Sequence, residues 1–492
     1  MPSTSLSSER DAASPTLSAP FFIRGKLVED TVVRHQSRDL HADFVTPILE
    51  ANSIVTPRSE LPPLLDVKLT EIVDFLVETG KRLTLERNPH LRRCLELLAS
   101  TNPLPRRVVE NLYHTAPEIL KRESLEAMVA TNFDNPAILD GWIRERSDGH
   151  GNTGAIRAYP PRMIHMLAGN APAGCIASIA QGALVKAINV FKMPSSDPFT
   201  TVAVLRTMAE IDPDHPVVRS MSAIYWRGGE VQLERTLYRP QYFDRIVAWG
   251  GGDAINNVIS YLGPGIQLVS FDPKTSISMI GREAFESDES IEAIAERTAA
   301  DTTVCNQDAC VASRFVFVEG DRAKVETYCA RLAERLAVDR AFGSAKATPL
   351  SMDIQEEVEV LTAMDEVKTW GRPDGSGLVI LSDEPVDFHP TNKTSNVVMV
   401  ERLEDAVRYV NVATQTIGVW PPERKTDLRD SLASAGGQRI CRLGTVWANV
   451  PGGPHDAMFA LQRFVKFIGE DDVVNIEANP EIGEARAAAS GS

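Results

Sequence analysis

The chain has 492 residues, of which 43% are hydrophobic and 24% are charged, the composition of a globular protein with two or three domains. Its 67 acidic residues against 51 basic ones give a net charge of −16, and without a strongly basic tract this argues against nucleic-acid binding. No apolar run approaches the roughly 20 residues that span a bilayer. The six cysteines form neither a disulfide framework nor a metal-spaced CxxC pair, so we expect a reduced, cytoplasmic protein without a metal site.

Both ends of the chain are predicted to be disordered tails, over residues 1–20 and 481–492. The first tail, MPSTSLSSERDAASPTLSAP, lacks the basic and apolar regions of a secretory signal. It is instead rich in serine, proline and alanine, which cannot build a packed core. The last stretch, EARAAASGS, has the same character.

Helices and then alternating strands and helices are predicted over residues 21–300. From about Ser59 to Ile143 apolar residues recur three and four positions apart, which is typical of helices. Short apolar strands that run into Gly, Pro and Ser turns then alternate with helical stretches, which indicates a parallel sheet of βαβ units. The strands are contained in MIHMLAGNAPAG, AINVFKMPSSDP, FDRIVAWGGGDAI and GIQLVSFDPKTSISMI. This region is therefore predicted to be an α/β domain with a parallel sheet, preceded by helices.

A second α/β domain is predicted over residues 301–442. The segment SDESIEAIAERTAAD has the start of a capped amphipathic helix and leads directly to two thiols in TTVCNQDACVASR. Strands and helices then alternate again, which predicts a second sheet. Residues 443–480 are predicted to form a returning segment.

Cys310 is the candidate nucleophile. It lies in a polar turn between a helix and a strand, where a loop presents functional groups from a rigid scaffold. A core residue at a strand start is the alternative interpretation, and it fits Cys305 and Cys329 at least as well. Cys329 lies in a helical stretch and is assigned to packing.

Three further turns follow predicted strands and carry candidate site residues. Asn170 can aim its amide at a developing oxyanion, or it can stabilise its own turn. Lys192 ends a strand and faces Ser195 across a turn, so the pair suits a phosphate or ribose, although without further context a solvated lysine is the favoured interpretation. Gly250–Gly252 stands between a strand and a helix N-terminus, a place that favours anions, although it is not a GxGxxG motif.

Taken together, these pieces resemble the aldehyde dehydrogenase superfamily and, within it, the LuxC-type acyl-CoA reductase family. The resemblance covers residues from about Leu65 to Ile468. It rests on LAGNAPAG, FKMPSSDPFT, SFDPKTS, NQDACVASR and GGPHDAM. It implies an aldehyde dehydrogenase-like fold, with a Rossmann-type dinucleotide-binding domain within residues 21–300, a catalytic thiol domain over 301–442 and a return segment over 443–480 that packs on the cofactor domain. It also implies NADPH-dependent reduction of an acyl thioester to the aldehyde through an acyl-cysteine.

The resemblance assigns roles to several residues. Cys310 matches the nucleophile, shortly before Arg314, and Asn170 matches the oxyanion-hole asparagine, with the Cys310 backbone N–H as the second donor. Lys192 matches the lysine that contacts the adenosine ribose, and Gly250–Gly252 the dinucleotide-binding turn. Ser195 stands where NAD-specific relatives often carry a glutamate that repels a 2′-phosphate, so NADPH is favoured.

Two departures from the superfamily pattern affect the predicted chemistry. Ser270 stands in the position of the glutamate that activates hydrolytic water, while the nearby Lys274 is retained. A hydroxyl without a neighbouring base cannot take a proton from water as a carboxylate does, so oxidation of aldehyde to free acid should be poor. The Glu-x-Phe-Gly-Pro that usually grips the nicotinamide ribose is missing, and DFHPTNKTSN lies about there. His389 is a possible substitute, or an ordinary polar loop histidine.

His455 and Asp456, in GGPHDAM, form a possible proton shuttle to the leaving group. A structural Gly-Pro turn before the last helix is the alternative. No residue in the sequence identifies the group that lowers the Cys310 pKa.

The resemblance suggests a fatty acyl-CoA or acyl-protein thioester substrate, an acid-activating acyl-protein synthetase or ligase as partner, and a homo-oligomer. Oligomerisation through the segment near LVILSD or through the N-terminal region is one expectation. An aromatic acyl thioester, a hydrolytic aldehyde dehydrogenase and a catalytically idle subunit are the alternatives. The sequence does not decide between an aliphatic and an aromatic acyl group.

Overall fold

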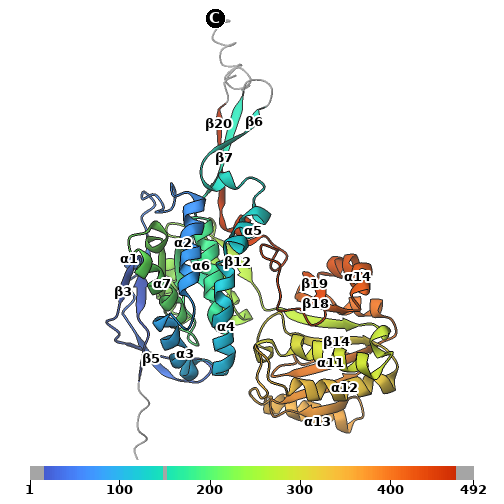
Figure 1. Cartoon of the computed structure of the whole chain (residues 1–492). Helices are drawn as coiled ribbons and strands as arrows, with labels where there is room; N and C mark the ends of the chain where they lie inside the picture. Colours follow the sequence, from blue (N-terminus) through green and yellow to red (C-terminus); the bar gives the residue numbers. More distant parts are fainter. Residues whose placement is uncertain (1–15, 148–151, 473–492) are drawn as a thin grey trace, which may run out of the picture.

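The computed structural model of the protein describes residues 16–147 and 152–472. Two lobes lie side by side, and a three-stranded arm projects from the first lobe, away from the body (Figure 1). The first lobe contains the N-terminal half of the chain, and the second contains most of the rest. This is the two-domain α/β architecture predicted from the alternation of strands and helices.

The first lobe is built on a seven-stranded sheet. Its central strands are parallel, and β2 and β3 close one edge in antiparallel orientation. In spatial order the strands are β12 (Gln267–Phe271), β11 (Arg245–Trp249), β8 (Arg162–Met166), β9 (Ile188–Lys192), β10 (Met221–Ile224), β2 (Phe21–Ile23) and β3 (Lys26–Val28). Every residue of β8 is buried, as expected for a parallel strand covered by helices on both faces.

Helices cover this sheet. The helical pattern predicted from Ser59 to Ile143 is confirmed, because α2 buries Ile72, Val73 and Leu76 on one face while its charged residues face outward. The larger helices of the lobe are α2 (Leu69–Arg82), α3 (Pro89–Thr101), α4 (Arg106–Ile119), α5 (Arg122–Asn132), α6 (Cys175–Leu184), α7 (Thr200–Ile211), α9 (Val231–Leu237) and α10 (Gly252–Ile259). Two single-turn helices complete it, α1 (Ala51–Ile54) and α8 (Pro216–Arg219).

The second lobe has a separate seven-stranded sheet, parallel except for β15. In spatial order its strands are β15 (Lys368–Arg372), β16 (Gly377–Ser382), β17 (Thr394–Val400), β14 (Ser313–Glu319), β13 (Thr275–Ile280), β18 (Thr414–Trp420) and β19 (Arg439–Arg442). Its helices are α11 (Asp288–Thr302), α12 (Arg322–Leu336), α13 (Met352–Ala363) and α14 (Pro422–Ala435). The predicted cap of α11 is confirmed, since Ser287 Oγ accepts the Ser290 N–H at 3.2 Å.

The boundary between the lobes differs from the one predicted at residue 300. β12 is the last strand of the first sheet, and β13, only three residues later, already pairs with β14 and β18 of the second. The second lobe therefore begins at Thr275. The sequence placed the division at the thiols because the helix before them looked like the last element of the first domain, whereas α11 packs on α12.

The return segment packs on the first lobe, in the place predicted for residues 443–480, of which 443–472 are described. Helix α15 (Ala460–Phe464) contacts α5 and α6, and the Leu461 N–H donates to Asn132 Oδ1 at 2.9 Å. Strand β20 (Lys466–Asp472) then pairs with β7 (Thr153–Tyr159), which pairs with β6 (Ile143–Ser147) to form the arm. Phe467 and Ile468 are exposed on the arm.

One expectation about the chain ends needs correction, and one about oligomerisation stays open. Within the predicted tail 1–20, Leu17–Ser18 form strand β1, which pairs with β5 (Asp43–Thr46) in a small sheet with β4 (Val33–Gln36). Residues 1–15 and the tail 481–492 lie outside the described residues. The segment LVILSD, near which an oligomer contact is expected, is mostly β16, which is paired on both sides, while the neighbouring β15 forms the edge of the sheet; oligomerisation stays a prediction.

Within the described ranges, no helix combines the length and the apolar character that a membrane crossing requires.

Candidate active site

The predicted groups of the first lobe lie at one edge of its sheet. Asn170 follows β8, Lys192 ends β9, Gly250–Gly252 follows β11, and Ser270 lies near the end of β12. Because these four strands are parallel neighbours, their carboxyl ends share that edge. The structure thus brings together the residues that the sequence assigned to a dinucleotide and an oxyanion.

The cysteine turn of the second lobe starts from an unusual backbone. Cys305, Asn306 and Gln307 have φ values of 50°, 55° and 73°, a left-handed turn of three non-glycine residues. Arg314, at the start of β14, donates from Nη2 to the Gln307 carbonyl at 2.7 Å and from Nη1 to the Pro390 carbonyl at 2.5 Å. This buried guanidinium therefore ties the cysteine turn to the loop before β17.

Cys310 itself is half-buried and lies just before β14. Its backbone carbonyl accepts the Ser276 hydroxyl of β13 at 2.7 Å, and Ser276 Oγ accepts the Thr416 N–H of β18 at 3.2 Å. The nucleophile candidate is thus fixed against two neighbouring strands. Cys305, by contrast, is 2% exposed, and Cys329 is fully buried in α12, as its assignment to packing predicted.

Asn170 reaches the cysteine turn from the other lobe. Its Nδ2 donates to the Asp308 carbonyl at 2.8 Å, two residues before Cys310. An amide nitrogen has two hydrogens, so the second remains to face an acyl oxygen. The oxyanion role of Asn170 stays a prediction, but the amide is in the turn where that role requires it.

The thiol of Cys310 sits in an environment that disfavours its ionisation. Burial raises the pKa of Cys310 and the Asp456 charge adds to this, while hydrogen bonds from the Gln415 amide and from backbone N–H groups act in the opposite direction. The sequence did not reveal which group lowers the pKa of this thiol. Gln415, on β18, is the principal side chain that does so.

The segment GGPHDAM, residues 452–458, contacts Gln415 of β18. Gln415 Nε2 donates to Asp456 Oδ1 at 2.8 Å, and Asp456 Oδ1 lies 3.7 Å from His455 Nε2. The His455 ring lies 5.3 Å from the Trp249 ring and 5.4 Å from the Phe271 ring, which stack on each other. Burial lowers the pKa of His455, against the effect of Asp456. The histidine proposed as a proton shuttle thus stands between the glycine turn and the site, and its role stays a prediction.

The residues assigned to the cofactor fit a dinucleotide. Lys192 is half-buried, and no carboxylate lies within ion-pair distance of its ammonium in the described ranges. Burial lowers the pKa of Lys192 to about 8, while Glu234 and Glu230 oppose the shift. Its ammonium lies over the rings of Tyr225 and Trp226, at 5.8 and 5.2 Å. An unpaired cation here suits ribose hydroxyls or a phosphate.

The serine and glycine turns of the cofactor edge are open. Ser195 Oγ accepts the Arg38 N–H at 3.2 Å and keeps its own hydrogen to donate. A Cβ at Gly251 or Gly252 would meet no atom within 4 Å, so a ligand can approach this backbone closely. Gly251 is the N-cap of α10, whose first N–H groups face the same turn.

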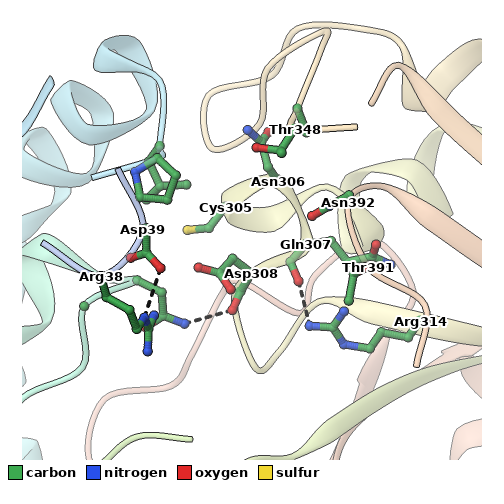
Figure 2. Close-up of a pocket in the computed structure, with 15 residues that line it drawn as sticks. Arg38, Asp39, Cys305, Asn306, Gln307, Asp308, Arg314, Thr348, Thr391 and Asn392 are labelled. Carbon is green, nitrogen blue, oxygen red and sulfur yellow. Dashed lines mark hydrogen bonds and ion pairs between the residues drawn. The ribbon is translucent and has the colours of Figure 1, made fainter. Parts of the chain in front are cut away.

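A polar cavity of about 210 Å³ lies beside the cysteine turn (Figure 2). Both lobes contribute to its walls, Asn170 from the first and Cys305 and Asp308 from the second. The other lining residues are Arg38, Asp39, Pro103, Leu104, Gly169, Asn306, Gln307, Arg314, Ala347, Thr348, Thr391 and Asn392. Its amide and hydroxyl groups suit a polar part of a substrate better than an alkyl chain.

The remaining predicted positions lie near the site without a clear catalytic contact. Ser270 is half-buried in β12 beside Ala248. Lys274 lies in the connection between the sheets, where its Nζ donates to the Val412 carbonyl at 3.3 Å. His389 lies in the loop that Arg314 holds, and burial with the nearby Arg314 charge lowers its pKa to about 4.

The fold is that of an aldehyde dehydrogenase. A salicylaldehyde dehydrogenase from Pseudomonas putida G7, solved with salicylaldehyde, superposes with a TM-score of 0.72 at 14% identity over 94% of this chain and 100% of its own. An NADP-dependent glyceraldehyde-3-phosphate dehydrogenase from Bacillus halodurans C-125, solved with NADP, gives 0.69 at 13% identity over 93% and 99%. At such low identity these likenesses define the fold alone.

Sequence comparison then identifies the family. Residues 64–467 match the acyl-CoA reductase (LuxC) family, so the chain belongs to it and is an oxidoreductase acting on an aldehyde or acyl group. The long-chain acyl-protein thioester reductase of Vibrio harveyi is 28% identical over 433 residues, 86% of this chain and 87% of the relative. The enzyme of the same name from Photorhabdus luminescens is 29% identical over 421 residues, 82% and 83%. The predicted family is confirmed.

Sequence reasoning missed Gln415 and Ser276 as neighbours of Cys310. One signal was available: in TQTIGVW, polar residues occupy the start of an otherwise apolar strand. Both Gln415 and Thr416 are buried, and a buried polar run of this kind indicates a built site. Nothing in the sequence indicated which residue it would meet.

Proposed function

We propose that the protein reduces a long-chain acyl thioester to the aldehyde, with NADPH as the reductant and Cys310 as the acyl carrier. The contact between Asn170 and the Asp308 carbonyl supports this most strongly, because it places an amide donor of the cofactor lobe in the turn of the thiol lobe. The names of the relatives favour a long acyl chain over an aromatic one.

The proposed reaction uses the described residues as follows. The Cys310 thiolate attacks the carbonyl carbon, and the Asn170 amide with the Cys310 N–H stabilises the oxyanion, an effect typically worth about 10²–10³-fold per donor. The oxyanion collapses, the substrate's sulfur leaves as a thiolate, and an acyl-cysteine remains. NADPH, when bound, would supply the hydride that reduces this thioester. The carbon–sulfur bond then breaks, which releases aldehyde and restores the Cys310 thiolate.

Lys192, Ser195 and Gly250–Gly252 would hold the dinucleotide. Lys192 offers an unpaired cation, and Ser195 offers a hydroxyl where a carboxylate would repel a 2′-phosphate. This combination favours NADPH over NADH.

Water is not a reactant in this scheme, and the position of the superfamily's hydrolytic glutamate is occupied by Ser270. Ser270 carries no charge. Asp456 is a carboxylate near Cys310, but it accepts the Gln415 N–H and is only 4% exposed. A carboxylate held in this way is a poor base for an incoming water molecule.

The acyl group is proposed to arrive as acyl-protein or acyl-CoA thioester from an enzyme that activates the free acid. The polar cavity beside the turn supports this, because the amides of a pantetheine arm or of a carrier protein find hydrogen-bond partners there. The protein is further proposed to form a homo-oligomer.

The test is a reductase assay with NADPH or NADH and a panel of thioesters that includes long-chain acyl-CoA, aryl-CoA and acyl-protein. We expect NADPH consumption matched by aldehyde, lost in Cys310→Ala and retained in the matched control Cys305→Ala. Formation of free acid from aldehyde and NADP⁺ without a thiol acceptor would instead establish a hydrolytic dehydrogenase. Activity that survives in Cys310→Ala would overturn the proposal.

A further inference from the structure

Gln415 is a buried amide beside the reacting sulfur. It is 4% exposed and lies one residue into β18. The neighbouring Thr416 N–H binds Ser276, which binds the Cys310 carbonyl, so the start of β18 and the cysteine turn form one connected unit.

Asp456 determines the orientation of the Gln415 side-chain amide. An ionised carboxylate only accepts hydrogen bonds, so the group that faces Asp456 Oδ1 at 2.8 Å must be the amide nitrogen. One hydrogen of that nitrogen is thereby used, and the second remains for the sulfur. The amide oxygen is buried and has no hydrogen-bond partner in the described structure. A buried amide with an unsatisfied oxygen is costly and calls for a functional reason.

The turn that holds Asp456 carries a second sign of function. Asp456 and Ala457 have φ values of 47° and 58°, both left-handed and neither a glycine. His455 and Met458 close this turn with two backbone hydrogen bonds of 3.0 Å each. Backbone strain of this kind is retained where it orients a functional side chain. Here it orients the Asp456 carboxylate, which is 4% exposed, toward Gln415.

We propose that Gln415 is a catalytic residue that stabilises the Cys310 thiolate through its second amide N–H, and that Asp456 is the positioning residue that fixes the amide in that orientation. This deepens the proposed function and rests on it only in taking Cys310 as the nucleophile. The amide transfers no proton. It makes a hydrogen bond to sulfur that strengthens when the sulfur becomes an anion.

Asp456 has two opposed effects. Its charge raises the Cys310 pKa, while the amide that it orients lowers it. The other ionisable groups around the thiol are Arg314 at the start of β14, Cys305 and Asp308 in the same turn, and His455 beside Asp456. The neighbours from the first lobe and from β13, Asn170 and Ser276, are neutral. Substitution at Gln415 and at Asp456 should therefore move the ionisation of Cys310 in opposite directions.

The experiment measures the rate of Cys310 alkylation by iodoacetamide from pH 6 to pH 10, with mass-spectrometric fragmentation to distinguish Cys310 from Cys305 on one peptide. Gln415→Leu is expected to move the midpoint at least about one pH unit higher, because a hydrogen bond to an anion is lost. Asp456→Asn keeps an acceptor oxygen but removes the charge, so its midpoint should move lower.

Gln438→Leu is the matched control. Gln438 lies just before β19 and its Nε2 donates to the Val412 carbonyl at 2.9 Å, away from the thiol. Its midpoint should equal that of the wild type. A Gln415→Leu protein that melts like the wild type but keeps its midpoint would overturn the proposal. If that variant does not fold, an Asp456→Asn midpoint that stays the same or rises would overturn it. Alkylation uses neither thioester nor NADPH, so a failed reductase assay leaves this result independent.

Discussion

The two sides of the site are built in different ways. The first lobe supplies Asn170, Lys192 and Gly250–Gly252 from turns that each follow a strand of one parallel sheet. The second lobe supplies Cys310, whose carbonyl accepts the Ser276 hydroxyl of β13 and whose surroundings include Gln415 of β18 and the turn at Asp456. The function of a contiguous turn can be predicted from its own residues. The surroundings of the thiol form only when segments that are far apart in the sequence fold together.

The comparison is tested most strongly at the two thiols of one turn. Cys310→Ala should lower thioester reduction by at least about 10⁴-fold, because the acyl carrier is lost. Cys305→Ala should retain most of the activity and lose only about 1 kcal/mol of unfolding free energy, since Cys305 is a buried packing residue. Steady-state rates and thermal melts check both. Equal losses in the two variants would show that the turn as a whole, and not one sulfur, carries the reaction.

Asn170→Ala tests the contribution of the first lobe to the reacting centre. We expect kcat to fall by about 10²–10³-fold, with a smaller change in KM, because the lost donor acts mainly on the oxyanion. Asn170→Asp is the conservative control: it keeps the shape but brings a charge that repels an oxyanion, so it should do no better. A variant that loses stability but keeps its kcat would show that the Asn170 contact only holds the two lobes together.

Ser195→Glu tests the cofactor edge. A carboxylate close to a 2′-phosphate should lower the preference for NADPH over NADH by roughly 10- to 100-fold, since like charges repel at that distance. The ratio of kcat/KM for the two cofactors measures the effect. Ser196→Ala, a buried neighbour in the same turn, should leave the ratio unchanged.

The pH dependence tests the thiol environment. Because burial raises the Cys310 pKa, the thiolate fraction should increase by up to about tenfold for each pH unit from pH 7 upward. Single-turnover acylation should accelerate accordingly. Burial also lowers the pKa of His455, which is therefore neutral throughout this range and adds no transition of its own. A rate that is flat between pH 7 and pH 9 would contradict the raised Cys310 pKa.

Much of the fold could be predicted because periodicity and turn residues are local. The capped helix Asp288–Thr302 and the fully buried strand Arg162–Met166 both follow from their own residues. The division between the lobes could not be predicted in the same way. The residues of strand β13 are compatible with either sheet, and only its pairing with β14 and β18 shows that it belongs to the second.

The candidate site likewise contains residues that could be predicted from the sequence and one that could not. Cys310 and Asn170 could be selected from the turns that carry them and from the family resemblance. Gln415 could not, because a glutamine in a strand acquires a role only through what faces it. Here these are a carboxylate 41 residues later and a thiol from another strand connection.

The most direct measurement is intact-protein mass spectrometry after incubation with a long-chain acyl-CoA in the absence of any nicotinamide. The account predicts one acyl group added per chain, mapped by fragmentation to Cys310 and discharged as aldehyde when NADPH is supplied. An unmodified Cys310 under these conditions, or an acyl group that discharges as free acid, would contradict it.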